Sequence, residues 1–204
     1  MAQNHQHTSK ENDILKEVIQ LAYICKYDEK HSRQVADLAL VLFDQLQDIH
    51  KLDRQARFWL ECAAILHDIG GAESWKGHHK NTLHIILSTK LLSLDNRTRL
   101  IIGSIARYHR KALPNLKHDH FAALDSKAQK IVINLAAILR FTNGLTRIHP
   151  SRMLDISCKI SPKNIIIKCI IPGPLPDKNQ HNDHKGFLLE DVYNRKLIVL
   201  WKSG

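Results

Sequence analysis

A chain of 204 residues can form one medium-sized domain with a buried core, and 44% hydrophobic with 25% charged residues is ordinary for a globular protein. Its net charge of +10, before any of its 14 histidines is counted, favours anionic partners such as nucleotides, polyphosphate or other phosphate esters. The basic residues form no stripe with interleaved aromatic residues, so we predict no specific nucleic-acid motif.

The sequence predicts neither a membrane segment nor a secretion signal. No apolar stretch approaches the roughly 20 residues that span a bilayer, and the polar N-terminus lacks the basic start and apolar core of a signal peptide. The cysteines stand singly among apolar residues, as expected of reduced core residues, and they are Cys25, Cys62, Cys158 and Cys169. We therefore expect a cytoplasmic protein that makes no membrane contact.

Helices dominate the expected structure up to residue 150. Residues 1–12 are polar and are expected to be a flexible lead-in. Apolar residues at helical spacing then predict helices over Asp13–Ala22, His31–Leu46, Asp53–Leu66, His78–Leu92, Thr98–His109 and Ser126–Gly144. Asp53 and Ser126 are the expected N-caps, and Gly70-Gly71 and Pro114 stop two of the helices.

The pattern changes at Pro150. Two β-branched segments, Leu154–Ile160 and Asn164–Ile171, predict a hairpin-like pair of strands. A polar loop over residues 172–184, a short helix near Phe187–Tyr193 and a final strand over Lys196–Trp201 complete the chain. The fold class predicted is mainly α, with a helical domain over residues 13–150 and a small α+β tail over residues 151–204.

The most informative motif is His67-Asp68, which ends the apolar run Ala63-Ala64-Ile65-Leu66. An imidazole and a carboxylate side by side on a buried helix end offer one nitrogen and one oxygen ligand at the same point. Burying both without a partner would cost several kcal/mol, so we expect a polar or metallic partner to meet them there.

Further histidines stand at the edges of the other predicted helices. His31 begins one helix, His78 and His79 begin another, and His109 ends a third. A phosphohydrolase built on a divalent ion needs such ligands from several helices to converge in one pocket. Surface or capping roles are expected instead for the histidines in loop-like context, namely His50, His118, His120, His181 and His184.

The order His31, His67-Asp68, His78, His109 resembles the HD superfamily of metal phosphohydrolases. The chain resembles more closely the C-terminal half of the Ppx/GppA family, the exopolyphosphatases and guanosine pentaphosphate phosphohydrolases. The resemblance covers roughly residues 13–204 and is carried by Ala64–Gly70 (AILHDIG), Gly77–Lys80 (GHHK), Ala106–Ala112 (ARYHRKA), Phe121–Leu124 (FAAL) and Leu188–Leu197 (LLEDVYNRKL).

This chain departs from the family pattern in two ways. It contains no glycine-rich phosphate loop of the kind found in the family's actin-like N-terminal half, so polyphosphate hydrolysis by that half's mechanism is not implied. Asn143 stands where HD proteins usually carry an aspartate ligand, and Thr146 stands where related sequences often carry a second aspartate. An asparagine can still offer its carbonyl oxygen, but it brings no negative charge.

The resemblance implies a set of site residues. The expected metal ligands are His31, His67, Asp68, Asn143, His78 and His109, for a divalent ion such as Mn, Fe, Ni, Zn or Mg. Asp68 and His67 are the expected catalytic pair, because Asp68 can orient or deprotonate an attacking water. Substrate phosphates are expected to bind Arg107, Arg110, Lys111 and His79, arginine through its two-pronged guanidinium.

Two functions follow from these expectations. The first is a cytoplasmic HD-type phosphohydrolase that acts on a nucleotide, polyphosphate or other phosphorylated anion. The alternative is a non-catalytic module that binds polyphosphate or a nucleotide through a degenerate metal site, as Asn143 suggests. The sequence leaves open the substrate, the metal, whether one or two ions bind, and whether the chain forms homo-oligomers.

Overall fold

The computed structural model describes residues 6–71, 76–149, 155–175 and 186–204. Pro150, Leu154 and most of the loop expected after residue 172 lie outside these ranges. In the described ranges the helices are α1 (Ser9–Ile24), α2 (Glu29–Gln45), α3 (Gln47–His50), α4 (Arg54–Leu66), α5 (His78–Ser88), α6 (Asn96–Arg107), α7 (Asp119–Ala122), α8 (Ser126–Ile148) and α9 (Phe187–Tyr193). A 3₁₀ turn, η1 (Ile69–Gly71), follows α4, and the strands are β1 (Asp155–Ile160), β2 (Asn164–Ile171) and β3 (Lys196–Ser203).

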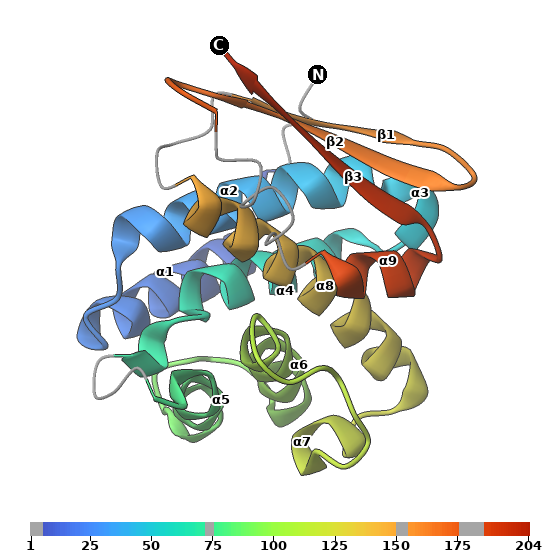
Figure 1. Ribbon diagram of the computed structural model, residues 1–204. Coiled ribbons are helices and arrows are strands. Elements are labelled where there is room, and N and C mark those ends of the chain that lie inside the picture. The colour runs from blue at the N-terminus through green and yellow to red at the C-terminus, as the bar shows by residue number, and fades with distance from the viewer. Residues whose placement is uncertain (1–5, 72–75, 150–154, 176–185) are drawn as a thin grey trace.

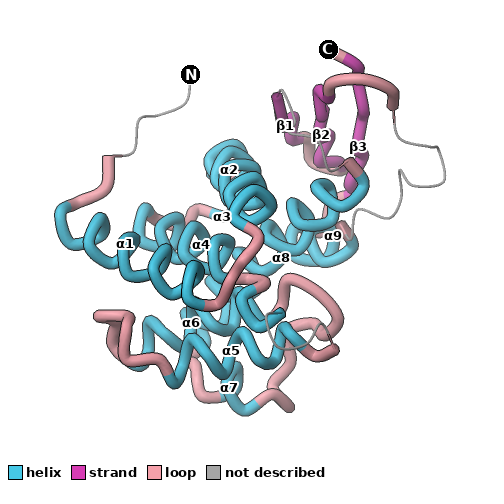
Figure 2. Tube along the Cα trace, turned by 90° about the vertical axis from the view of Figure 1, so that its left-hand side faces the viewer, coloured by secondary structure: helices cyan, strands magenta, loops and turns pink. Residues whose placement is uncertain are grey.

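The predicted fold class is confirmed, because a mainly helical body is followed by a small sheet near the C-terminus. Figure 1 shows the three strands lying across one end of the molecule over α2, with α5, α6 and α7 at the opposite end. The perpendicular view in Figure 2 shows the same separation, with the sheet beside α8 and α9. The His–Asp motif at the end of α4 therefore belongs wholly to the helical body.

The sheet has the order β1-β2-β3. β1 and β2 form the expected antiparallel hairpin, whereas β3 runs parallel to β2 after the crossover through α9. Along β2 every second residue is buried, since Ile165, Ile167, Cys169 and Ile171 face the helices. These side chains join the same hydrophobic cluster as the helices, so the tail shares the core of the body. A subdomain boundary near residue 150 stays a prediction.

Two helices are longer than the sequence pattern predicted. α1 begins at Ser9, so residues 9–12 are helical, because Thr8 and Glu11 form a reciprocal capping box that the apolar spacing does not reveal. α8 is capped by Asp125 through a hydrogen bond from the amide of Ala128 (2.8 Å), not by Ser126. It also continues through Gly144 to Ile148, because Leu145 is fully buried and holds the last turn in the core.

One helix is shorter than expected. α5 ends at Ser88 and not at Leu92, because the backbone becomes extended at Thr89. Leu92 then packs into the core with 2% of its surface exposed, and the guanidinium of Arg99 binds the carbonyl groups of Thr89 and Leu92. α6 begins at Asn96 with Asp95 as its N-cap, two residues before the predicted start at Thr98.

α8 is the central helix of the body. Among the described residues it is the one helix that is long and apolar enough to cross a membrane, judged by length and composition. Some 72% of its most apolar window is buried inside the protein, as expected for a core helix. One face of α8 also reaches the histidines, because Asn143 and Arg147 are one turn apart on it.

Candidate metal centre

The helix ends of the body converge on Asp68, which is 8% exposed. His67 caps the C-terminus of α4, His78 opens α5, and His109 follows α6. His31 lies in the first turn of α2, which Asp28 caps by accepting a hydrogen bond from the amide of His31 (3.0 Å). Helix ends can carry these buried polar residues because the apolar face of each helix stops there and is not interrupted.

Four imidazole nitrogens surround the carboxylate of Asp68. Its Oδ1 lies 3.0 Å from Nε2 of His78 and 3.2 Å from Nε2 of His109. Its Oδ2 lies 3.3 Å from Nε2 of His67 and 3.8 Å from Nε2 of His31. Asn143 completes the group, with its Oδ1 3.1 Å from Nε2 of His31. The structure thus brings together all six residues that the sequence suggested as metal ligands.

The tautomers of two histidines are fixed by the backbone. Nδ1 of His67 donates to the carbonyl of Ala64, and Nδ1 of His109 donates to the carbonyl of Ala106, each at 2.7 Å. A neutral imidazole whose Nδ1 carries the proton has only a lone pair on Nε2. Both Nε2 lone pairs therefore face a carboxylate oxygen, which is also an acceptor. Backbone bonds of this kind orient histidines that ligate metals.

The orphaned atoms of this cluster fit a cation. His67 Nε2 and Asp68 Oδ1 are buried and have no hydrogen-bond partner in the described part of the chain. The ligand atoms of the cluster form two groups, one from His31, His67 and Asp68 and the other from Asp68, His78 and His109. Within each group, all ligand atoms lie within 4.8 Å of one another. Metal–nitrogen bonds of about 2.1 Å place neighbouring ligands roughly 3 to 3.5 Å apart. The residues present therefore suit one or two divalent cations.

The charge state of the cluster agrees with this fit. Burial acts to raise the pKa of Asp68, but its imidazole neighbours, His67 first, outweigh burial and hold that pKa well below its usual range. Burial lowers the pKa of His109 to about 3, and burial followed by the charge of His67 lowers the pKa of His31. A charged carboxylate beside neutral imidazoles such as that of His109 is the state in which these groups ligate metals.

Arg147 was not among the candidates from the sequence, yet it reaches the same carboxylate. Its Nη2 donates to Oδ2 of Asp68 at 3.2 Å, from a side chain that is 42% exposed. Arg147 follows Asn143 by one helical turn, so the spacing would have revealed it had α8 been expected to continue past Gly144. The cluster thus has the amide of Asn143 where an aspartate is usual, and the guanidinium of Arg147 one helical turn beyond it.

Gly70 allows α5 to approach the motif. A Cβ at this position would lie 2.2 Å from the carbonyl oxygen of His78 and 2.5 Å from the amide of Thr82. Thr82 Oγ1 links the two segments, since it accepts from the amide of Gly70 and donates to the carbonyl of His67, each at 3.1 Å. This contact sets the distance between His67 and His78.

Arg140 holds the segment that follows His109. Its guanidinium, on the buried side of α8, donates to the carbonyl groups of Tyr108 (3.2 Å), Lys111 (3.2 Å) and Ala112 (3.3 Å). Arg140 is only 5% exposed and lies over the ring of Phe187, 4.9 Å from its centroid. It is a positioning residue, because it fixes the turn that carries His109 without contacting Asp68.

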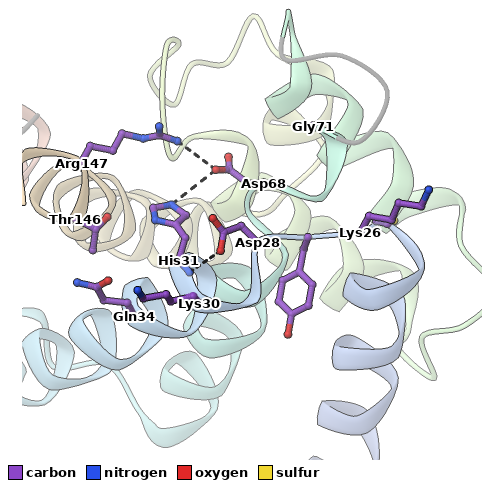
Figure 3. Close-up of a pocket in the computed structure, with 11 residues that line it drawn as sticks. Lys26, Asp28, Lys30, His31, Gln34, Asp68, Gly71, Thr146 and Arg147 are labelled. Atoms are coloured by element: carbon purple, nitrogen blue, oxygen red, sulfur yellow. Dashed lines mark hydrogen bonds and ion pairs between the residues drawn. The ribbon is translucent and has the colours of Figure 1, made fainter. Parts of the chain in front are cut away.

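The cluster opens into a cleft of about 810 Å³. Figure 3 shows Arg147 and His31 pointing toward Asp68 at its wall, with Lys26 and Lys30 on the same lining. Sequence reasoning missed both lysines, because no motif marks Lys30, which directly precedes His31, or Lys26, which precedes α2. Positive charge beside a carboxylate–imidazole cluster gives the cleft the means to bind an anion next to a cation.

The residues expected to bind substrate lie elsewhere. Arg107, Arg110, Lys111 and His79 are absent from the lining of this cleft. Arg107 and His79 are buried, with 6% and 8% exposed, Arg110 is half-buried, and Lys111 is exposed. His79 directly follows His78 on α5, and such neighbours do not share a helix face, whereas Arg110 and Lys111 lie beyond the end of α6.

Fold and cluster together define a mainly helical domain with a buried His–Asp centre suited to a divalent cation. Residues 15–180 match the family model described as Ppx/GppA phosphatase, domain III. This match covers most of the chain, and the chain therefore belongs to the Ppx/GppA domain III family.

Three curated relatives share the name guanosine-5'-triphosphate,3'-diphosphate pyrophosphatase. The relative from Vibrio vulnificus (strain YJ016) is 29% identical over 114 residues, which are 55% of this chain and 23% of the relative. The relative from Pseudoalteromonas atlantica (strain T6c) is 27% identical over 161 residues, 78% of this chain and 30% of the relative. The relative from Pseudoalteromonas translucida (strain TAC 125) is 29% identical over 133 residues, 63% of this chain and 27% of the relative. The matched part of the chain spans less than a third of each relative's length.

Proposed function

We propose that this chain is an HD-type, divalent-metal-dependent phosphohydrolase that acts on a nucleotide, polyphosphate or other phosphorylated anion. The observation that carries the proposal is the buried carboxylate of Asp68 with four imidazole nitrogens within 3.8 Å. Family membership and relatives named for hydrolysis of a guanosine polyphosphate support the substrate class. The four cysteines, which are free thiols, suit a reducing cytoplasm, where we place the protein.

His31, His67, Asp68 and the amide oxygen of Asn143 would hold one divalent cation, of Mn, Fe, Ni, Zn or Mg. His78 and His109 would hold a second ion together with the other oxygen of Asp68. A divalent cation in such a site supplies a nucleophilic water at neutral pH and neutralises charge on a phosphoryl group.

The chain's own residues would then divide the remaining work. Asp68, as a charged carboxylate at the cleft wall, would orient the attacking water, with His67 fixed beside it by the carbonyl of Ala64. Arg147, Lys26 and Lys30 bind the phosphate oxygens from the cleft lining. The sequence-based substrate residues Arg107 and His79 act outside this cleft.

A second candidate function is a binding module that captures a phosphorylated anion without turnover. Two observations favour it. Asn143 brings no charge to the cluster, and Arg147 donates to Asp68 where a cation would otherwise neutralise it. Both features lower the affinity of the site for a divalent ion, because they reduce the negative charge that faces it.

Turnover separates the two functions. Chelator-treated protein is given Mn²⁺ and then guanosine triphosphate or inorganic tripolyphosphate, and released phosphate is measured. The enzyme releases phosphate only with added metal, loses this activity in His67→Ala, and keeps it in His84→Ala, which removes an exposed histidine of α5. The outcome against the enzyme is a parent protein that binds guanosine triphosphate and tripolyphosphate but releases no more phosphate than His67→Ala does. The chain would then be a binding module.

A further inference from the structure

A second group of basic side chains lies beside the metal centre and forms no ion pair with Asp68 in the described structure. His79 follows His78 on α5, Arg107 ends α6, and His120 belongs to the single turn of α7. The rings of His78 and His79 are 5.7 Å apart between centroids. The two groups therefore adjoin at the N-terminal turn of α5.

Arg107 is the unusual member of this group. Its side chain is only 6% exposed, yet no described carboxylate pairs with it, and its Nη1 has no hydrogen-bond partner among the described residues. Its guanidinium carbon lies 6.0 Å from the centroid of the Tyr108 ring. Burial lowers the pKa of Arg107, but a guanidinium stays protonated in proteins. A buried charge without a partner is strongly destabilising, which calls for a counterion.

The side chains around Arg107 are donors and cations. His120 contributes Nε2, a buried atom without a hydrogen-bond partner in the described ranges, while its Nδ1 lies 2.9 Å from Oγ of Ser104. Burial, followed by the charge of Arg107, lowers the pKa of both His79 and His120 to about 4. Arg110 and Lys80 add positive charge near His79. The one acidic group acting on His120 in the described chain is Asp119, which is exposed.

We propose that Arg107, His79 and His120 form an anion site, separate from the metal centre, that binds one tetrahedral phosphate group. The guanidinium offers two parallel N–H groups to two phosphate oxygens, and the imidazole nitrogens donate to the others. The phosphate is either free orthophosphate or the terminal group of a polyphosphate or nucleotide chain. This inference goes beyond the proposed hydrolysis, because the site needs neither a metal ion nor turnover.

The test measures phosphate binding with the cleft disabled. All proteins carry Lys26→Gln, Lys30→Gln and Arg147→Gln and are kept in EDTA, so that neither the cleft nor a metal contributes. Orthophosphate and tripolyphosphate are titrated, and thermal midpoints and binding isotherms are recorded. Arg107→Met removes the unpaired guanidinium, and Arg97→Met is the matched control, because Arg97 already pairs with Asp125 at 2.7 Å.

We expect phosphate to raise the thermal midpoint of the background protein and of Arg97→Met, but not of Arg107→Met. Without phosphate, Arg107→Met should be at least as stable as the background protein, because an unpaired buried charge is gone. Equal affinity for orthophosphate and tripolyphosphate would show that the site takes free orthophosphate. Tripolyphosphate binding that is at least tenfold tighter would show that the site takes the terminal phosphate of a chain.

Equal phosphate binding in the background protein and Arg107→Met would overturn the proposal, as would an absence of binding in the background protein. If Arg107→Met does not fold, Arg107→Lys and His120→Gln take its place. Each is expected to weaken orthophosphate binding at least threefold, since lysine keeps the charge but lacks the fork and glutamine lacks the imidazole. Unchanged affinity in both variants would equally refute the site.

Discussion

The two carboxylate oxygens of Asp68 have different neighbours. Oδ1 is nearest to His78 and His109, whereas Oδ2 is nearest to His67 and also accepts from Arg147. A single carboxylate can therefore serve two neighbouring cation positions. On the Oδ2 side the protein already supplies a positive charge, so adding a negative charge there and removing the positive one should both tighten metal binding.

Asn143→Asp should tighten divalent-metal binding. The new carboxylate would stand 3.1 Å from Nε2 of His31 and add a charged oxygen to the ligands, which we expect to lower the dissociation constant for Mn²⁺ about tenfold. Calorimetric titration measures this change. Asn134→Asp makes the same charge change on α8 away from the cluster and should leave the affinity unaltered. Equal affinities in the parent and Asn143→Asp would place Asn143 outside the coordination shell.

Arg147→Gln should also tighten metal binding, but it should weaken anion binding. The guanidinium competes with a cation for Oδ2 of Asp68, and removing a half-exposed partner of this kind is worth about 0.6 kcal/mol, or about threefold in affinity. Tripolyphosphate loses a phosphate contact in the same variant. Arg33→Gln, which removes an exposed partner of Glu29, serves as the control. Weaker metal binding in Arg147→Gln would show that the arginine supports the site instead of competing for it.

At the scale of elements, the approach of α5 to η1 determines whether His78 can reach Asp68. Gly70→Ala would force a Cβ against the carbonyl of His78 at 2.2 Å, so the two segments must separate. We expect the free energy of unfolding to fall by about 2 to 3 kcal/mol, as for other overpacked sites. Metal affinity should fall as well, because His78 moves with α5.

The control for this change is Gly173→Ala, at a glycine with φ +83° and no atom within 4 Å of the added Cβ. It should cost about 1 to 2 kcal/mol of backbone strain and leave metal affinity intact. If Gly70→Ala binds metal as tightly as the parent does, the separation between η1 and α5 does not govern the centre.

Much of the element order could be predicted from the sequence, because apolar spacing marks α2, α4 and α6 with little ambiguity. The limits of α1 and α8 could not. A capping box extends α1 upstream of its first apolar residue, and burial of Leu145 carries α8 past an Asn-Gly pair that usually stops a helix. The parallel pairing of β3 with β2 is a tertiary choice that no local pattern encodes.

The candidate ligands could be predicted because each histidine stands at a helix end, where the spacing of the helices forces convergence. Arg147 was missed as a direct consequence of ending α8 too early. The two lysines of the cleft were missed for another reason, since a lysine in or just before the first turn of a helix carries no local signal of what it will face. Conversely, Arg107 and His79 stand within two residues of His109 and His78 in the sequence but do not line the cleft.

At the scale of the whole molecule, part of the net charge of +10 comes from two sets of basic residues. One set lines the cleft, and the other surrounds Arg107 and His79. We expect polyphosphate binding to weaken as salt rises, because each phosphate contact releases counterions. The double variant Arg107→Ala, Arg110→Ala should bind more weakly at every salt concentration and show a smaller salt dependence.

Titrations of tripolyphosphate between low and high salt measure both quantities. Lys159→Ala, Lys202→Ala lowers the net charge equally from the exposed side of the sheet and should change binding far less. If both double variants lose the same amount of tripolyphosphate affinity, the attraction comes from net charge alone, and no local anion site at Arg107 is needed.

The metal content of the whole protein tests the central claim most directly. Protein purified without chelator is analysed for Mn, Fe, Ni and Zn, and its thermal midpoint is measured before and after EDTA treatment. The buried cluster around Asp68 predicts about one or more metal ions per chain. Removing the metal should lower the thermal midpoint, because bound metal stabilises only the folded state. His67→Ala should lose the metal and the EDTA response, whereas His84→Ala should keep both. Full metal occupancy in His67→Ala, or a parent that neither carries metal nor binds added Mn²⁺, would contradict the assignment of a metal centre at Asp68.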